Sequence, residues 1–229
     1  MNAHLTFDLL AAASSLGLTW LLVRGPLGAS LQRVETLGWT YYAALALGAI
    51  WGAFALGTTN LWISDQPGLG RSILGAFLGA ILMVELAKLV LGHKGSTGAL
   101  FVPAFTVSTV VGRWGCFLSG LDDQTHGTRT TLFWGVDFGD GPRHPVQLYE
   151  SATMALALVV WLWMLRYRPE TFRRTGFYLL CIVYGGQRFL WEFLKPYTTV
   201  LGPLNLFHLA CLALIGYGTW MISRAPKPA

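Results

Sequence analysis

Residues of the kinds that recognise phosphate and move protons are concentrated between positions 112 and 150. This segment holds three arginines, two histidines, four aspartates and one glutamate, although only 12% of the whole chain is charged. An arginine can donate two parallel hydrogen bonds to a phosphate group, and a histidine can accept a proton near neutral pH. Polar groups beside a membrane are costly unless they line a site, so we expect the functional site here.

Arg113 is the first candidate for phosphate binding. It lies between Gly112 and Gly115, whose missing side chains let the backbone approach a ligand or a neighbouring helix. At a membrane surface its guanidinium group is suited to a pair of phosphate oxygens. The alternative is an interfacial arginine that only extends its charged end into water.

A second group of candidates closes the segment. Arg143 and His144 are followed by Tyr149 and Glu150 in the first turn of an expected helix. His144 is the predicted proton acceptor, with Arg143 and Glu150 as further catalytic residues. The alternative for Glu150 is a favourable interaction with the positive end of the helix.

Arg188 and Glu192 form the third candidate pair. They are four residues apart in an apolar stretch, so they share one face of a helix. Charged pairs in such stretches usually face the interior of a bundle, where they either bind a ligand or fix helix packing.

Metal binding is not expected from the sequence. His126 lies near Asp122 and Asp123, but no ligand spacing relates the three. Cys116 carries no local pattern of a nucleophile and is expected to be a packed thiol. The prediction is therefore a site without metal or other cofactor.

Composition indicates where these residues must lie. The 229 residues are 54% hydrophobic, with a mean hydropathy of +0.51, whereas soluble domains carry about 25% charged residues. We expect an all-α integral membrane protein in which residues 1–229 form a single domain. The net charge of +5 comes from residues scattered among loops, which favours anionic lipid headgroups and not nucleic acid as partners.

Seven apolar stretches are candidates for a seven-helix transmembrane bundle, since a helix needs about 20 residues to cross a bilayer. They are residues 5–23, 37–57, 72–91, 100–111, 147–165, 176–194 and 204–222. A polar loop, residues 112–146, is expected between spans four and five. Basic residues follow spans one, three and five, which places those connections in the cytoplasm. The polar loop and the N-terminus then face outside, and the C-terminus is cytoplasmic.

Three motifs, in order, resemble the prolipoprotein diacylglyceryl transferase family of bacteria. Residues 112–117 (GRWGCF) are similar to its Gly-Arg-x-Gly-Asn-Phe signature. Residues 143–150 (RHPVQLYE) are similar to its Arg-His-Pro-Ser-Gln-Leu-Tyr-Glu motif, and residues 184–196 to its Tyr-Gly…Arg…Glu helix. The similarity covers about residues 70 to 218.

The resemblance implies a transferase of the bacterial inner membrane. Such an enzyme moves a diacylglyceryl group from phosphatidylglycerol to the cysteine thiol of a lipoprotein precursor, in which that cysteine belongs to a lipobox. Arg113 and Arg188 would hold the lipid phosphate, Glu192 would orient Arg188, and Arg143 and His144 would lie at the mouth. The remaining residues expected to bind substrate are Gly112, Gly115, Gly127 and Tyr149.

Two departures from the family pattern leave alternatives open. A family histidine of the third span is Leu74 here, and the asparagine of the first motif is Cys116. One alternative keeps the phospholipid donor and uses an acceptor other than a lipoprotein. Another is a non-catalytic phospholipid-binding membrane protein on the same scaffold.

Overall fold

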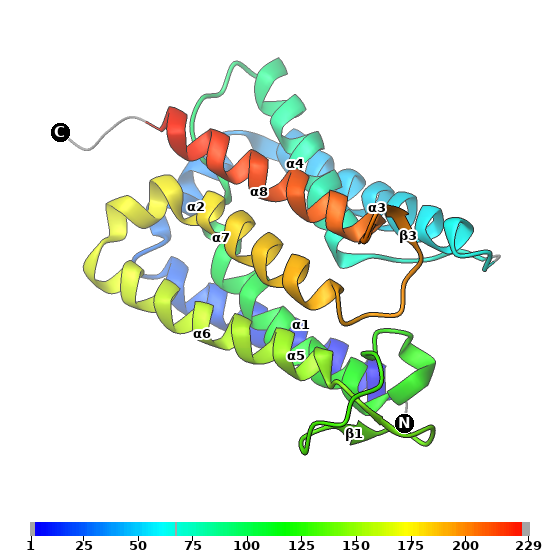
Figure 1. Cartoon of the computed structure of the whole chain (residues 1–229). Coiled ribbons are helices and arrows are strands. Elements are labelled where there is room, and N and C mark those ends of the chain that lie inside the picture. The colour runs from blue at the N-terminus through cyan, green and yellow to red at the C-terminus, as the bar shows by residue number, and fades with distance from the viewer. Residues whose placement is uncertain (1–2, 67, 226–229) are drawn as a thin grey trace.

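The computed structural model describes residues 3–66 and 68–225, and most of them are helical (Figure 1). The elements in chain order are α1 (Ala3–Val23), α2 (Gly28–Glu35), α3 (Gly38–Ile63), α4 (Ile73–Val90), η1 (Gly98–Phe101), α5 (Val102–Leu118), η2 (Gly120–Asp123), β1 (Val136–Asp137), β2 (Pro142–Arg143), α6 (Val146–Tyr167), α7 (Pro169–Glu192), β3 (Thr199–Leu201), β4 (Leu204–Asn205) and α8 (Leu206–Arg224). The predicted all-α architecture is confirmed in outline. The four strands form two short antiparallel hairpins, and an isolated bridge also pairs Arg143 of β2 with Arg129.

Six helical stretches in the described part of the chain are long and apolar enough to cross a membrane. They are α1, α3, α4, the stretch from η1 through α5 (Gly98–Leu118), α6 and α8. The stretch predicted at residues 176–194 lies in α7, which is not among the six. Polar residues of α7, including Arg188 and Glu192, reduce its hydropathy.

The prediction of where the fourth span ends was wrong. We expected the helix to stop at residue 111 and the polar loop to begin at 112, but α5 continues to Leu118. Gly112, Arg113 and Gly115 are therefore helical residues. The sequence misled because an arginine between glycines is typical of a loop, whereas here a buried ion pair with Glu150 holds Arg113 inside the bundle.

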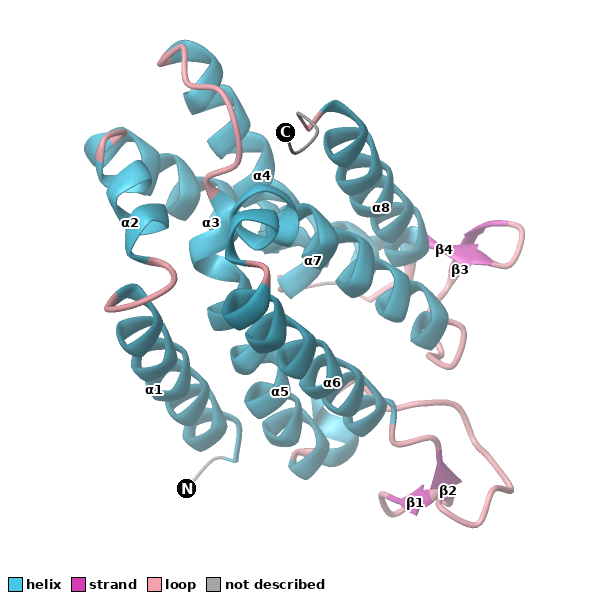
Figure 2. Cartoon of the chain, turned by 90° about the vertical axis from the view of Figure 1, so that its left-hand side faces the viewer, coloured by secondary structure: helices cyan, strands magenta, loops and turns pink. Residues whose placement is uncertain are grey.

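The helices pack as neighbours along one another (Figure 2). α1 packs on α5, α5 on α6, and α6 on α7, while α3 pairs with α4 and α7 pairs with α8. The apolar core includes Leu74 and Phe77 of α4, Met154 of α6, and Leu180 and Tyr184 of α7. α7 contacts α5, α6 and α8, and its polar residues Gln187, Arg188 and Glu192 are buried.

Glycines bring α3 and α4 into backbone contact. A Cβ atom placed on Gly52 would lie 2.2 Å from the carbonyl oxygen of Gly75, and one on Gly48 would lie 2.4 Å from that of Gly79. Each helix thus contributes two glycines four residues apart to the contact. This spacing is the small-residue pattern that lets membrane helices approach closely.

The connection between α5 and α6, residues 119–145, lies at the end of the bundle where α1 begins (Figure 1). Its strands β1 and β2 pair antiparallel, with Val136 opposite Arg143. The backbone N–H of Thr128 donates to the carbonyl oxygen of Leu194 at 2.6 Å, which ties the connection to the end of α7. The last turns of α8 lie at the opposite end of the bundle.

Candidate active site

Glu150 is the centre of a buried group of charged side chains. It is the fifth residue of α6 and is fully buried. Its carboxylate contacts Arg113 Nε at 2.5 Å, Lys195 Nζ at 2.7 Å and Arg188 Nη1 at 3.3 Å. Residues from α5, α6, α7 and the segment after α7 thus meet at one carboxylate.

Glu192 holds the other side of Arg188. Its Oε2 is 2.9 Å from Arg188 Nε, one helical turn away, and its Oε1 accepts a hydrogen bond from Asn205 Nδ2 at 3.2 Å. Asn205 also caps α8, because its side-chain oxygen accepts from the backbone N–H of His208. The guanidinium plane of Arg188 is therefore fixed by carboxylates from two helices.

The group carries an excess of positive charge. We call Arg113, Arg188, Lys195, Glu150 and Glu192 the cationic cluster; three cations face two carboxylates. All five side chains are buried. A buried charge is costly unless it is paired, so the net charge of +1 makes the cluster a favourable place for one anionic group.

A polar cavity of about 810 Å³ reaches Arg113 from the same end of the bundle as the α5–α6 connection. Arg71 and Asn60 also line it. A second cavity, of about 380 Å³, is lined mainly by apolar side chains such as Leu45, Phe77 and Phe105. Ile73 and Ser108 line both cavities, so the two are adjacent.

Polar atoms without partners lie on the same helix faces as the cluster. The Tyr184 hydroxyl and both amide atoms of Gln147 are buried and have no hydrogen-bond partner among the described residues. Tyr184 is one turn before Arg188, and Gln147 is one turn before Glu150. Buried polar groups usually have partners, so a polar ligand beside the cluster would satisfy these.

Arg143 and His144 do not join the cationic cluster. Arg143 forms an ion pair with Asp140 and donates to the carbonyl oxygen of Gly127 at 3.0 Å, which holds the α5–α6 connection together. The hydrogen bond between Arg143 and Asp140 lowers the pKa of the Asp140 carboxyl group and raises the pKa of the Arg143 guanidinium group. His144 Nδ1 lies 3.4 Å from the hydroxyl of Tyr149.

The three predicted glycines have different surroundings. Gly112 lines the polar cavity and has free space where a Cβ would lie. A Cβ on Gly115 would lie 2.7 Å from Cβ of Phe7, so Gly115 allows α1 to pack on α5. A Cβ on Gly127 would lie 2.4 Å from the carbonyl oxygen of His144, so this glycine serves packing within the connection.

Sequence reasoning missed Lys195, Arg71 and Asn205. Lys195 follows α7 and precedes a proline, which is also the pattern of a cation that flanks a membrane helix. The sequence feature that could have identified Lys195 is its position three residues after Glu192, at the end of that span expected to face outside. Arg71 and Asn205 lie just before α4 and α8, and nothing in their local sequence indicates a site.

A further charged pair, Glu85 and Lys88 of α4, lies elsewhere. Lys88 Nζ contacts Glu85 at 2.8 Å, and the hydroxyl of Tyr217 donates to Glu85 at 3.0 Å. These residues join α4 to α8 and have no contact with the cationic cluster among those described. They are consistent with a structural pair.

Fold and site together define a multi-pass membrane protein with a buried cationic cluster near an apolar cavity. The chain belongs to the prolipoprotein diacylglyceryl transferase family, whose model matches residues 13–224.

Three curated relatives are each named phosphatidylglycerol–prolipoprotein diacylglyceryl transferase. The one from Nitratidesulfovibrio vulgaris (strain DP4) is 35% identical over 162 residues, covering 64% of this chain and 59% of the relative. The one from Oleidesulfovibrio alaskensis is 32% identical and covers 69% and 61%. The one from Polynucleobacter asymbioticus is 30% identical and covers 94% and 88%. The chain thus spans about three fifths of the length of the first two relatives.

Proposed function

We propose that this protein transfers a diacylglyceryl group from phosphatidylglycerol to an acceptor thiol, as in the lipidation of lipoprotein precursors. The observation that carries the proposal is the buried cationic cluster with its excess of one positive charge. Phosphatidylglycerol presents one phosphodiester, which carries one negative charge. The names of the curated relatives support the same donor and acceptor.

The two adjacent cavities match the two parts of such a lipid. The glycerol phosphate headgroup would occupy the polar cavity beside Arg113, and the acyl chains would enter the apolar cavity beyond Ile73 and Ser108. Binding cavities typically have volumes of about 300–1,000 Å³, which includes both.

The reaction is a displacement at the glyceryl carbon that carries the phosphate. The acceptor sulfur forms a C–S bond, the C–O bond breaks, and its electron pair leaves with the phosphate oxygen of glycerol phosphate. Arg113, Arg188 and Lys195 would stabilise the negative charge that develops on this oxygen. Glu150 and Glu192 would fix the directions of the cations.

The remaining candidate residues have proposed roles at the mouth of the site. His144 is the side chain that we propose as proton acceptor for the thiol, with Tyr149 beside its ring. Arg143 would keep the α5–α6 connection in place through Asp140 and Gly127.

We also propose a topology in which α7 crosses the membrane as well, as the sixth of seven spans in chain order. Its 24 residues would extend about 36 Å, enough to cross a bilayer. Packing against α5, α6 and α8 keeps its polar face away from lipid. Arg24, Lys94, Arg166 and Arg174 lie at the ends of helices away from the α5–α6 connection. This supports an outer face at that connection, with the N-terminus outside and the C-terminus in the cytoplasm of the bacterial inner membrane.

One observation favours a second candidate function. Leu74, which stands where the family has a histidine, is fully buried in the core and can neither accept nor donate a proton. A protein that binds phosphatidylglycerol without turning it over would keep the cluster and lose this histidine. A transferase with another acceptor would also be compatible with the change.

The test measures glycerol phosphate release and peptide lipidation by purified protein, with phosphatidylglycerol and a peptide containing a lipobox cysteine. Arg113→Ala and Arg188→Ala should each reduce both products by roughly 100-fold or more, because each removes a buried charge from the departing phosphate. Arg129→Ala is the matched control, since this arginine belongs to the α5–α6 connection and is largely exposed. Unchanged folding is checked by gel filtration in detergent.

Because Arg113 also neutralises Glu150, a conservative variant is needed. Arg113→Lys retains the positive charge and loses the planar guanidinium group with its paired donors. This variant should fold normally and bind the lipid more weakly than the wild type. Full activity of Arg113→Ala or Arg188→Ala would contradict phosphate binding by the cluster. Glycerol phosphate without peptide lipidation would favour another acceptor, and lipid binding with neither product would favour the non-catalytic candidate.

The role of His144 is tested in the same assay. His144→Ala should lose activity, whereas His126→Ala, in the same connection, should retain it. A normal rate for His144→Ala would remove His144 from the mechanism.

A further inference from the structure

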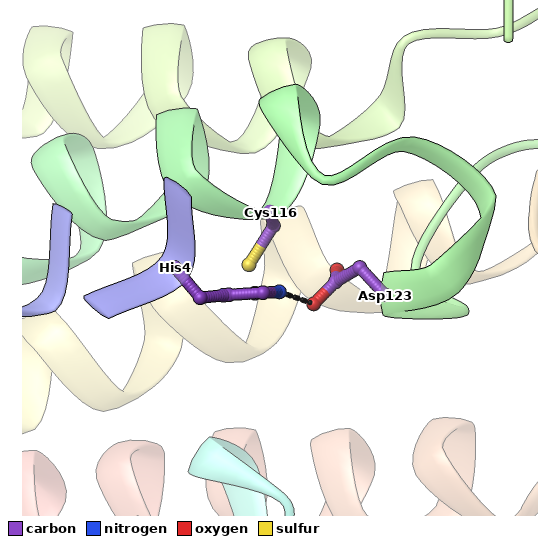
Figure 3. Close-up of side chains that lie close together, drawn as sticks. All are labelled: His4, Cys116 and Asp123. Carbon is purple, nitrogen blue, oxygen red and sulfur yellow. Dashed lines mark ion pairs between the residues drawn. The ribbon is translucent and has the colours of Figure 1, made fainter. Parts of the chain in front are cut away.

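Three side chains from different elements meet beside the polar cavity, and two of them line it. They are His4 of α1, Cys116 of α5 and Asp123 of η2 (Figure 3). His4 Nε2 lies 2.6 Å from Asp123 Oδ1, and the Cys116 Sγ atom points toward the same space. The imidazole nitrogen, the sulfur and the carboxylate oxygen all lie within 4.8 Å of one another. This grouping differs from the one considered in the sequence, which paired Asp123 with His126.

The backbone around these side chains is well anchored. α1 packs closely on α5 where Phe7 meets Gly115, which places His4 beside the last turn of α5. The hydroxyl of Thr125 donates to the second carboxylate oxygen of Asp123, Oδ2, and this hydrogen bond fixes the orientation of the carboxylate. Metal-binding carboxylates are commonly oriented by hydrogen bonds of this kind.

The donor set is that of a zinc site. One nitrogen, one sulfur and one oxygen are ligands that Zn²⁺ accepts together, whereas Mg²⁺ and Ca²⁺ prefer oxygen alone. Zinc bonds of about 2.0–2.3 Å in a tetrahedron require ligand atoms roughly 3.3–3.8 Å apart, so shifts of about 1 Å in these half-buried side chains would suffice.

The fourth position of such a site would face the polar cavity. Cys116 and Asp123 both line that cavity, together with Arg113. Arg113 Nη1 lies 3.9 Å from the sulfur of Cys116, and the two residues are one turn apart on α5. A ligand in the fourth position would therefore be next to the place proposed for the lipid phosphate. Three protein ligands with an open position are typical of catalytic zinc sites.

We propose that His4, Cys116 and Asp123 bind Zn²⁺, and that its fourth position takes the acceptor thiolate during transfer. The second half of this inference rests on the proposed function. The acceptor thiol gives up its proton when it binds the metal, because a coordinated thiol is deprotonated, and His144, the acceptor proposed above, takes this proton. Its sulfur then forms the C–S bond to the glyceryl carbon, the C–O bond breaks, and the electron pair leaves on glycerol phosphate. No oxidation or reduction occurs, and no histidine is needed at Leu74.

The first measurement is metal content. Protein purified through an affinity tag without histidines should contain about one Zn²⁺ per chain by mass spectrometry. Cys116→Ser and His4→Gln should each lower bound zinc by roughly 10-fold or more. Cys181→Ser is the matched control, because this thiol is buried in the core away from the cavity, and its zinc content should be unchanged.

Cobalt gives a signature that a purely structural contact would not produce. After removal of zinc with a chelator, Co²⁺ should produce a thiolate-to-metal absorption band in the wild type and in Cys181→Ser, and no such band in Cys116→Ser. Gel filtration identifies any variant that has not folded, and His4→Gln then provides the second test, since it leaves the thiol in place. Zinc content near zero and no cobalt band in the folded wild type would overturn the metal site.

The role in transfer is tested separately from the metal site. Chelation should abolish peptide lipidation, and added Zn²⁺ should restore it. Lipidation that persists in metal-free protein would overturn thiolate binding by the metal and leave the proposed function intact. Bound zinc in a protein that releases no glycerol phosphate would overturn the proposed function and the metal's part in it, while the site itself would stand.

Discussion

Replacing Glu150 by glutamine tests whether one carboxylate holds the cationic cluster together. The side chain keeps its size and loses its charge, so Arg113, Arg188 and Lys195 are left with only Glu192 as a counter-charge. The net charge of the cluster changes from +1 to +2. The new amide also directs N–H groups toward cations that have no use for a donor.

The expected cost follows from the distances. At 2.7 Å, the attraction between Lys195 and Glu150 is about 6 kcal/mol for an effective dielectric constant of about 20. Much of this attraction offsets the desolvation of the two charges, and removing one partner of a buried pair typically costs about 3–5 kcal/mol. For a chain of this size, that loss corresponds to a decrease in Tm of roughly 6–20 °C.

Thermal unfolding in detergent, followed by tryptophan fluorescence, measures this decrease. Glu35→Gln is the control, because Glu35 is an exposed carboxylate at the end of α2 and its loss should change Tm by little. The double variant Glu150→Gln/Lys195→Met returns the net charge of the cluster to +1. It should therefore be more stable than Glu150→Gln alone.

Either of two results would refute this reasoning. A Tm of Glu150→Gln equal to that of the wild type would mean that the carboxylate does not offset the buried cations. A double variant that is less stable than Glu150→Gln would mean that Lys195 contributes through packing and not through its charge.

Two further predictions concern the scaffold and pH. Gly52→Val should destabilise the protein by roughly 1–3 kcal/mol or more, because the valine side chain would collide with the backbone of Gly75. Gly17→Ala, on an exposed face of α1, is the control and should leave stability unchanged. Equal Tm values for the two variants would contradict the close contact of α3 and α4. The pKa of His126 lies below its ordinary value of 6.5, mainly because the ring is partly buried and secondly because Arg143 is positively charged. As pH falls below 6.5, the unfolded chain therefore binds more protons than the folded one. The Tm of the wild type should therefore decrease as pH falls from 6.5 through the pKa of the folded state, and the Tm of His126→Gln should decrease less between about pH 7 and about pH 5. Parallel curves of Tm against pH for wild type and variant would exclude the effect.

Local patterns predicted much of the fold. Apolar stretches of about 20 residues indicate membrane-spanning helices because lipid cannot satisfy backbone polar groups. Six of the seven predicted stretches coincide with described helices of sufficient length and hydropathy. The polar face of α7 could not be assigned in this way, since hydropathy counts residues and does not register which neighbours cover them. The continuation of α5 to Leu118 was also hidden, because the ion pair that buries Arg113 is made with a residue of another helix.

The types of residue at the site were also readable from the sequence alone. Arg113, Arg188, Glu150 and Glu192 stand out because charges in apolar surroundings are costly. Their meeting around one carboxylate was decided by packing, because four segments far apart in the chain must converge for it. Lys195 joins them, and Arg143 and His144 stay apart, for the same reason. The grouping of His4 with Cys116 and Asp123 likewise exists only because α1 packs along α5, a contact between residues more than a hundred positions apart that no local pattern encodes.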